Sequence, residues 1–350
     1  MWREFMRNLY KFMMLSIVGI VMMCSFQRFA YADDSPTFEY YVTPIFTDNQ
    51  SDDKRGYFDL LVKPGEVQEL KLEVSNTSKQ KKKLTITPTT AGTTSNGTID
   101  YSGKEWRHTS NLVAKFSDIA SEPQTVELKP EEKKVVTFEV KVPDEKFEGQ
   151  IVGAFYVKED STEKEETKST SENGIGIKNE FAMIIACVLM TDEKIPDQDF
   201  ELGPVKIDTY GGLLSLKTDL SNHTARLLTN YSLEGTILTA KGKKVMDIAL
   251  SDISMAPNSI YEMPLQINSS DFPAGKYKMA LTIHDRAKEK EWEIATDFKI
   301  KAEERQEAIK ESIDSVVWYK TTSGMLIIAL IVLVIIMFIV ILRNKRKGSQ

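Results

Sequence analysis

The sequence has few of the residues on which metal and redox sites depend. Its 350 residues include two cysteines, Cys24 and Cys187, and three histidines, His108, His223 and His284. None of the histidines belongs to an HExxH motif, and no CxxC motif is present, so the sequence gives no support for a zinc site. We therefore expect no metal and no other cofactor.

Motifs of catalysis are also scarce. There is no GxSxG nucleophile elbow and no phosphate loop of the Walker type. The SxxK match at residues 161–164 lies in a charged stretch without a KTG motif, which favours a chance match. Cys187 has apolar neighbours on both sides, which is typical of a core cysteine rather than a nucleophile. The sequence leaves open whether a carboxylate pair for glycoside hydrolysis is present, because 51 Asp and Glu residues offer too many candidates.

The charge is mildly acidic. A formal net charge of −6, with 27% charged and 41% hydrophobic residues, is an ordinary globular composition with room for two domains. Nucleic-acid binding usually needs a basic face and is not expected. A short basic run, KQKKK at residues 79–83, is typical of a solvated hairpin loop. The alternative is a contact with an anionic wall polymer.

The N-terminus has the layout of a secretory signal peptide. Basic residues precede an apolar run at residues 12–23, and the small residues Ala30 and Ala32 lie just before two aspartates. This predicts a signal peptide at residues 1–32 that is cleaved after Ala32, with an uncleaved N-terminal anchor as the alternative.

The C-terminal part predicts a membrane anchor. Residues 325–342 form an unbroken apolar run, long enough to cross a hydrocarbon core as a helix. Trp318 and Tyr319 precede it, and a basic tail at residues 344–350 follows. We expect a single transmembrane helix at residues 323–343 with a cytoplasmic tail. The protein would then lie in the cell membrane, with its remaining part exposed at the cell surface.

Period-two alternation of apolar and polar residues dominates the segment between the two ends. Turn signals such as Pro64-Gly65 and Asn96-Gly97 separate the alternating stretches. The expected fold class is all-β, with two tandem immunoglobulin-like β-sandwich domains whose strands pair antiparallel. The residues expected on buried strand faces are Leu70, Leu72, Val74, Val136, Phe138, Val140, Val142, Leu214, Leu216, Leu220, Tyr261, Met263, Leu265, Ile267, Tyr277, Met279, Leu281 and Ile283.

The domain boundary is expected near residues 195–200. The apolar run FAMIIACVLM at residues 181–190 favours a strand buried on both faces, and Ile-Pro-Asp follows as a linker. The two domains would then cover residues 33–195 and 196–301. Apolar residues at helical spacing next predict an amphipathic juxtamembrane helix at residues 302–322.

Short sequence blocks in both predicted domains carry a family resemblance. In the first domain they are Tyr41-Val42-Thr43-Pro44-Ile45, Asn49-Gln50, Gly56-Tyr57-Phe58-Asp59-Leu60, Pro64-Gly65, Asn96-Gly97-Thr98-Ile99-Asp100-Tyr101 and Gly149-Gln150-Ile151-Val152-Gly153. They continue at Leu202-Gly203-Pro204-Val205, Ala256-Pro257-Asn258-Ser259, Ala274-Gly275-Lys276-Tyr277 and Trp292. In this order the blocks resemble the WxL-interacting proteins of Gram-positive bacteria, in which a DUF916 domain and a DUF3324 domain precede a membrane helix. The resemblance covers nearly the whole chain, and the absence of disulfides in the exported part fits a Gram-positive surface.

The resemblance implies a non-enzymatic surface adaptor. Its first domain is similar to modules that bind peptidoglycan, and its second to modules that bind a WxL-domain protein. The alternatives are an adhesin that binds host matrix proteins and, less in keeping with the motifs, a wall-modifying enzyme.

Two groups of residues are candidates for these contacts. Aromatic rings stack on sugars and Asn or Asp bind hydroxyls, but the same residue types also build turns and cores. The peptidoglycan candidates are Tyr57, Asp59, Asn96, Asp100 and Tyr101. The WxL-partner candidates are Asn222, Ala256, Pro257, Asn258, Ser259 and Trp292.

Overall fold

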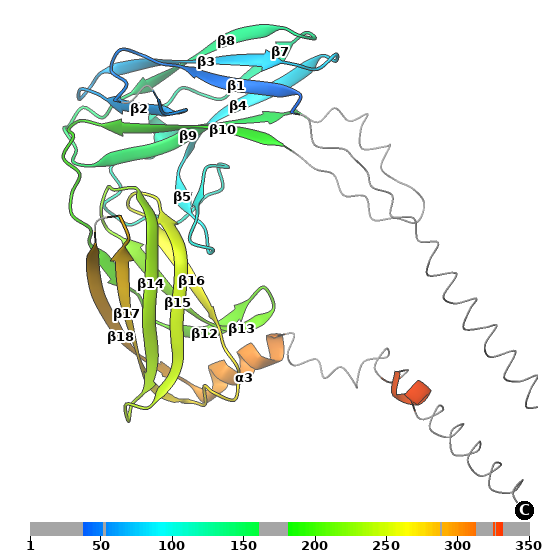
Figure 1. The fold of residues 1–350 in the computed structure, drawn as a ribbon, viewed down its shortest axis with the longest axis vertical. Coiled ribbons are helices and arrows are strands. Elements are labelled where there is room, and N and C mark those ends of the chain that lie inside the picture. The colour runs from blue at the N-terminus through cyan, green and yellow to red at the C-terminus, as the bar shows by residue number, and fades with distance from the viewer. Residues whose placement is uncertain are drawn as a thin grey trace, which may run out of the picture. The chain divides into compact units, whose positions relative to one another are not determined.

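Two β-sandwiches make up most of the computed structural model, which describes residues 38–51, 54–160, 181–287, 289–312, 325 and 327–331. Both sandwiches belong to the single compact unit Tyr40–Gln350. The all-β class predicted from the sequence is therefore confirmed (Figure 1). The predicted signal peptide lies outside the described residues, as does most of the predicted membrane segment. No helix within the described ranges is long and apolar enough to cross a membrane.

The first sandwich packs a three-stranded sheet, in the order β1-β3-β8, on a five-stranded sheet, in the order β2-β10-β9-β4-β7. Its strands are β1 (Tyr40–Ile45), β2 (Phe58–Leu61), β3 (Val67–Asn76), β4 (Lys82–Thr90), β7 (Gln124–Leu128), β8 (Lys133–Lys141), β9 (Gln150–Glu159) and β10 (Ala182–Met190).

Alternating burial creates the core of this sandwich. In β3, Leu70, Leu72 and Val74 are fully buried while the residues between them face outward, as the alternation predicts. Phe155 lies at the centre, with the rings of Phe58, Phe116 and Phe138 within 4.8 to 6.1 Å of its own. Removing such a side chain would cost about 3–5 kcal/mol.

Strand β10 is buried on both faces only in its second half. Ile184 near its start is 45% exposed, but Cys187 and Val188 are both buried. Cys187 faces the first core, and Val188 faces a small cluster that includes Ala256 of the second sandwich. The second sandwich therefore covers the outer face of β10 at this point. In addition, β10 pairs with β2 in parallel, which the expected antiparallel sandwich did not include.

A long excursion, residues 91–123, connects β4 to β7. It contains the short strands β5 (Gly92–Thr93) and β6 (Ile99–Asp100), which pair as a hairpin, and the single-turn helix α2 (Phe116–Ile119). Phe116 anchors the excursion in the first core. Gly153 makes room for it, because a Cβ there would lie 2.3 Å from the Phe116 ring.

The second sandwich consists of two four-stranded sheets whose pairs are all antiparallel. In one sheet β13 pairs with β11 and β12 on one edge and with β16 on the other, and the second sheet has the order β15-β14-β17-β18. The strands are β11 (Phe200–Leu202), β12 (Lys206–Tyr210), β13 (Leu213–Asn222), β14 (Leu228–Thr239), β15 (Lys244–Met255), β16 (Ile260–Gln266), β17 (Gly275–Asp285) and β18 (Lys290–Ile300).

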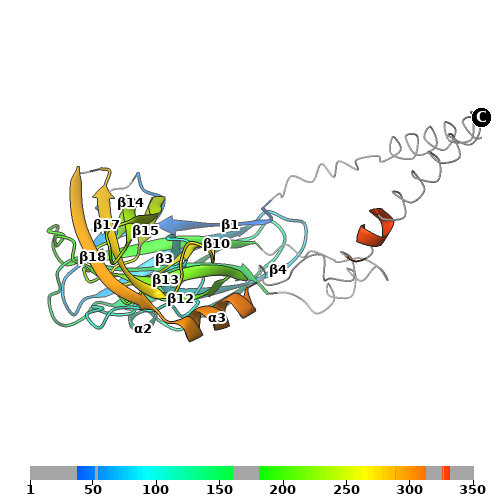
Figure 2. The same ribbon diagram turned by 90° about the horizontal axis from the view of Figure 1, so that it is seen from below.

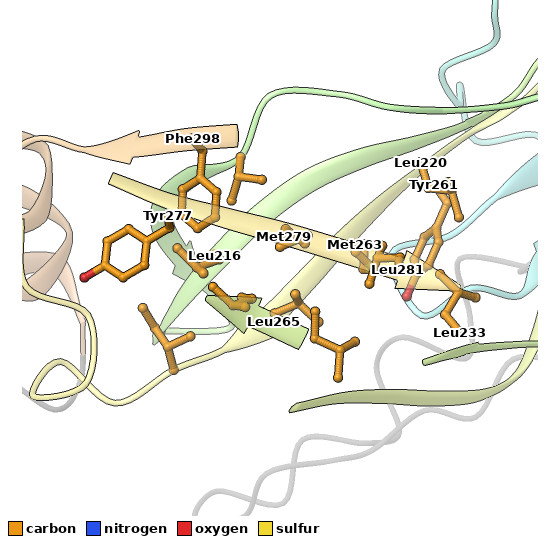
Figure 3. Packing of buried hydrophobic residues seen from close by; sticks show 14 of the residues in the cluster. Leu216, Leu220, Leu233, Tyr261, Met263, Leu265, Tyr277, Met279, Leu281 and Phe298 are labelled. Atoms are coloured by element: carbon orange, nitrogen blue, oxygen red, sulfur yellow. The ribbon is translucent and has the colours of Figure 1, made fainter. Parts of the chain in front are cut away.

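Figure 3 shows how the second core fills the space between these sheets. Leu216 of β13, Leu265 of β16 and Met279 of β17 point into the same interior, together with Tyr277 and Phe298. All the alternating residues that were predicted to face inward in this domain are buried.

Helix α3 (Ala302–Glu311) follows β18 and packs on the second sandwich near β12 (Figure 2). Ala308 is buried in the second core, and the Arg305 guanidinium donates to the carbonyl oxygens of Phe272 and Ser269 at 2.9 and 2.7 Å. The predicted helix at residues 302–322 thus starts at the expected position. It ends at Glu311, however, because Ser312 has extended backbone angles, and residues 313–322 lie outside the described part.

Both sandwiches contain the same strand-end motif, which was not predicted from the sequence. Each of the ten-residue strands β3 and β13 ends in a buried asparagine, Asn76 or Asn222. The side-chain amide nitrogen donates to backbone carbonyls, three for Asn76 and two for Asn222, and the side-chain oxygen accepts bonds from the residue two positions later. The backbone N–H of each donates at 2.9 Å to the last residue of a Pro-containing turn, Glu132 or Ser259.

Candidate functional site

A pocket of about 290 Å³ opens beside the excursion in the first sandwich. Trp106 forms one side, half-buried against Gly92. A Cβ on Gly92 would lie 2.2 Å from the indole Cδ1, so only glycine allows this packing. The residues lining the pocket are Thr87, Pro88, Thr89, Thr90, Gly103, Lys104, Glu105, Trp106, His108, Lys115 and Ser117.

Asp100 fixes the orientation of the tryptophan. The Trp106 Nε1–H donates to Asp100 Oδ2 at 2.6 Å, and Ser102 Oγ donates to the same oxygen at 2.7 Å. Desolvation raises the pKa of Asp100, but the hydrogen bonds from Ser102 and Trp106 outweigh it and hold the pKa below its usual value. The carboxylate is therefore ionised at neutral pH and serves as a fixed acceptor for the indole.

Two lysines line the pocket together with Trp106. Lys104 Nζ lies 4.3 Å from the centroid of the Trp106 ring, which is a cation–π distance. Lys115 pairs loosely with the exposed Glu105 at 3.7 Å, and His108 Nε2 lies 3.0 Å from the carbonyl oxygen of Ala91. An indole with lysines beside it can stack on a sugar ring and pair with an attached carboxylate.

The structure separates the five peptidoglycan candidates. Asp100 borders this pocket through Trp106, but Tyr57 and Tyr101 lie half-buried in the small cluster that also contains Val188 and Ala256. Burial and the nearby Tyr57 raise the pKa of Tyr101 to about 12, so both rings serve first as packing groups.

Asp59 and Asn96 lie elsewhere. Asp59 is 3% exposed, and its Oδ2 accepts a hydrogen bond from Arg55 Nη1 at 2.7 Å. The same guanidinium nitrogen donates to Tyr57 Oη at 2.8 Å, so this ion pair ties Asp59 to the ring. Asn96 is exposed at the tip of the β5–β6 hairpin, and its neighbour Gly97 contacts Ile253 of the second sandwich.

Trp106 itself was not among the predicted residues. A tryptophan inside the polar stretch SGKEWRH was the available signal, since such a setting gives the ring no obvious core to fill. Sequence spacing did not show that Trp106 folds back onto Gly92 and Asp100.

The WxL-partner candidates lie mainly inside the contact between the two sandwiches. Asn222, Ala256 and Ser259 are 0% exposed and Asn258 is 1% exposed, and Pro257 is buried as well. The expected turn at residues 256–259 does form, but it is not an exposed surface, because the excursion of the first sandwich covers it.

Several hydrogen bonds make this contact. Thr93 Oγ1 bonds to Ser259 Oγ at 2.5 Å and accepts from the Ala256 N–H at 3.0 Å. The Thr109 N–H donates to the Asn258 carbonyl at 2.7 Å. Arg107 pairs with Asp219 on β13, and this ion pair raises the pKa of the guanidinium. The same excursion that forms the Trp106 pocket therefore also joins the two sandwiches.

Trp292 belongs to an aromatic cluster at the edge of the second core. Its ring lies 5.5 Å from Phe200 and 6.2 Å from Tyr231. Tyr231 Oη donates to Asp285 Oδ2 at 2.9 Å, and burial together with this bond raises the tyrosine pKa. The half-buried indole is thus held by neighbouring aromatic rings.

Two family models match this chain. One, described as the peptidoglycan binding domain of WxL Interacting Protein, matches residues 40–159. The other, described as the host binding domain of WxL Interacting Protein, matches residues 172–310. The chain belongs to the WxL-interacting protein family. The resemblance found in the sequence is thereby confirmed.

The second description differs from what the resemblance implied. It names host binding, whereas we expected a WxL-binding domain, and the WxL partner stays a prediction. The match also begins at residue 172, upstream of β10, although β10 pairs with β9 and β2 in the first sandwich of this family member.

The solved structures that match this chain include fimbrial chaperones. A chain from a chaperone–tip adhesin complex of CFA/I fimbriae biogenesis is 11% identical, with 75% of this chain and 99% of that chain covered at a TM-score of 0.31. The CupB2 chaperone of Pseudomonas aeruginosa is 10% identical, with 67% and 93% covered at 0.24. These TM-scores carry no functional meaning. No curated protein matches the sequence significantly.

The cysteine and histidines show no catalytic arrangement in the described part of this WxL-interacting protein. Cys187 is fully buried, and desolvation, with a smaller effect of Asp59, raises the pKa of its thiol. A buried neutral thiol is a poor nucleophile. No cluster of three or more metal-ligating side chains occurs among the described residues. The SxxK match at residues 161–164 lies outside them.

Proposed function

We propose that the protein is a non-enzymatic adaptor of the bacterial cell surface, whose first sandwich binds peptidoglycan at the Trp106 pocket. The observation that carries this proposal is the oriented indole with Lys104 and Lys115 beside it, inside the range that matches the peptidoglycan-binding family model. Peptidoglycan offers pyranose faces for stacking and peptide carboxylates for the lysines.

Co-sedimentation of the full chain with insoluble peptidoglycan tests this site. Trp106→Ala should weaken binding about tenfold or more, because the stacking surface is lost. Tyr41→Ala provides a matched control, since Tyr41 is a 45% exposed aromatic residue on β1 of the same sandwich. Equal binding by wild type and Trp106→Ala, with both proteins folded, would rule out the pocket.

A second substitution separates stacking from charge. Lys104→Glu keeps the indole but reverses the charge above it, so it should weaken binding to intact peptidoglycan more than to glycan strands stripped of their peptides.

Tyr57→Ala examines the other aromatic candidate. Unchanged binding by a folded Tyr57→Ala protein would identify that ring as structural.

The second sandwich binds a protein in this proposal. The sequence resemblance supports a WxL-domain partner, whereas the description of the second family model supports a host protein. Pull-down of the full chain against a purified WxL domain and against host matrix proteins distinguishes the two. Capture of neither would count against the adaptor role.

Export and anchoring complete the proposed role. The sequence at residues 1–32 supports removal of a signal peptide, and the apolar run at residues 325–342 supports a single membrane anchor. N-terminal sequencing of the mature protein and fractionation of cells expressing a chain truncated before residue 323 test these two points. The truncated chain should leave the membrane fraction.

The enzymatic alternative has a direct assay. The adaptor role predicts that purified full chain releases no soluble fragments from peptidoglycan. Release that disappears on a single Asp, Glu or Cys substitution would favour a wall-modifying enzyme instead.

A further inference from the structure

The outer face of the sheet β15-β14-β17-β18 is hollowed by a groove of about 1060 Å³. The core-facing residues of these strands, such as Ile237, Met279 and Leu281, are buried beneath it. The groove crosses four strands, which at about 4.8 Å per spacing gives a length of about 14 Å, or about four residues of extended chain.

Strand register explains the hollow. Thr236 of β14 lies opposite both Asp247 of β15 and Ala280 of β17, and Ala280 lies opposite Ala295 of β18. Thr236, Ala280 and Ala295 therefore form a row of small side chains across β14, β17 and β18, with Asp247 at its β15 end. In the next row Ala249 and Thr282 are also small, and Glu234 and Glu293 are the larger side chains, so the small side chains of both rows form the floor.

The walls of the groove are acidic. Four carboxylates, those of Glu234, Asp247, Glu291 and Glu293, line it together with one lysine, Lys278. Asp247 pairs with the exposed Lys244 at 2.8 Å. Because carboxylates outnumber the lysine in the lining, the potential in the groove favours a cationic ligand and disfavours anionic wall polymers. The Trp106 pocket differs in charge, since two lysines, Lys104 and Lys115, and one carboxylate, Glu105, line it.

His284 adds an acceptor at one end. Its Nδ1 lies 3.0 Å from Glu291 Oε1, and its buried Nε2 has no hydrogen-bond partner in the described structure. A proton on Nδ1, donated to Glu291, leaves the buried Nε2 as an acceptor without a donor, on a residue that lines the groove.

We infer that this groove binds an extended, lysine- or arginine-bearing segment of a protein partner. The inference rests on the proposed adaptor function of the second sandwich and specifies where and by what chemistry the partner is held. Small residues on the floor admit a polypeptide backbone, and the carboxylates that line the groove pair with its cationic side chains.

Fluorescence anisotropy of the full chain with a short labelled peptide of alternating lysine and alanine tests the chemistry. We expect saturable binding that falls about tenfold in the E234Q/E293Q variant at low salt. The matched control is E69Q/E139Q, which removes two exposed carboxylates that lie opposite each other on β3 and β8 of the first sandwich. A peptide of alternating glutamate and alanine should not bind.

Three results would overturn the inference: no saturable binding of the lysine peptide, equal weakening in the control variant, or unchanged affinity in E234Q/E293Q. Ala280→Trp, which fills the floor while leaving every charge in place, should also abolish peptide binding, with its melting curve confirming the fold. Unchanged peptide affinity in a folded Ala280→Trp protein would place the peptide outside the groove.

Pull-down of a WxL domain or host matrix protein by the Ala280→Trp variant separates this inference from the proposed function. Capture lost together with the peptide supports the groove as the partner site. Capture retained while peptide binding is lost leaves the adaptor role intact and overturns the groove as its partner site. Peptide binding by wild type without capture of any protein supports the groove chemistry and counts against the adaptor role.

Discussion

The turn at residues 129–132 of the first sandwich and the turn at residues 256–259 of the second follow the same local design. Each has proline at its second position and a residue with left-handed backbone at its third, with φ of 59° at Glu131 and 49° at Asn258. Each is tied to a strand-end asparagine, Asn76 or Asn222.

Their surroundings are opposite. Lys129, Pro130 and Glu131 are exposed to solvent, whereas all four residues at 256–259 are buried beneath residues 93–109 of the excursion. Local sequence thus determines that a turn forms, and the neighbouring sandwich determines whether that turn is a surface. The same design can be an exposed loop in one domain and a domain contact in the other.

Replacing the two asparagines should give the largest difference. Asn222→Ala removes the hydrogen bonds from the Asn222 side chain to the carbonyl oxygens of Arg226 and Ala256, where water is excluded, and should lower the free energy of unfolding by about 3 kcal/mol. Asn76→Ala should cost about half as much, since water reaches the exposed turn in that sandwich. Urea unfolding of both variants measures the difference; equal losses would mean that the burial of the second turn has no energetic effect.

Alkaline pH should destabilise the contact between the two sandwiches. Burial raises the pKa of Tyr101 and of Tyr261 from 10.0 to about 12. A raised pKa favours the neutral phenol in the folded protein, so the stability is fully present below pH 10 and is lost as pH rises towards 12. We expect a loss of about 2 kcal/mol per tyrosine over this range.

Unfolding by urea at several pH values measures this loss. Tyr261→Phe should lessen it, because the ring stays buried without an ionisable group. A Tyr261→Phe protein that loses stability as steeply as wild type would show that this phenol ionises freely in the folded state.

Thr93→Val tests the first-sandwich side of the contact. The change keeps the shape of the side chain but removes the oxygen that accepts from the Ala256 N–H and bonds to Ser259. The buried N–H then lacks a partner, and stability should fall by about 1–2 kcal/mol. Thr43→Val on the exposed face of β1 serves as the control and should change stability by less than about 0.5 kcal/mol. A loss in the control as large as in Thr93→Val would contradict the proposed role of the contact.

The smallest expected effect comes from making the exposed turn resemble the buried one. Glu131→Asn places asparagine, which tolerates left-handed backbone better than glutamate, at φ of 59°. The melting temperature measured by differential scanning calorimetry should rise, and the free energy of unfolding should increase by about 0.5 kcal/mol. A lower melting temperature would mean that Glu131 has a stabilising role beyond its backbone conformation.

Strand faces were the most predictable feature of the fold. The apolar positions of β3, β8, β13, β16 and β17 alternate with polar ones, and their burial follows from the period of two alone. Helix α3 was predictable at its start but not at its end, because the helical spacing of apolar residues continues in the sequence past Glu311, whereas the backbone is already extended at Ser312.

The candidate site was less predictable. Tyr57, Asp59 and Tyr101 are the residue types that a glycan site uses, yet Arg55 and a small apolar cluster engage them. Trp106 was not predicted as a site residue, because its contacts with Gly92 and Asp100 form only when the excursion folds. The groove on the second sandwich arises from cross-strand register, which links Thr236, Ala280 and Ala295 over long sequence separations.

By itself, the sequence determined the all-β class, the buried faces of the strands and the positions of the turns. These properties depend on interactions between residues that are near in the chain, chiefly the alternation of side chains and the backbone preferences of Pro, Gly and Asn. Only the tertiary structure decided that residues 256–259 are a domain contact, that Trp106 forms a pocket and that an acidic groove crosses four strands. Each of these depends on contacts between distant segments, which local preferences do not specify.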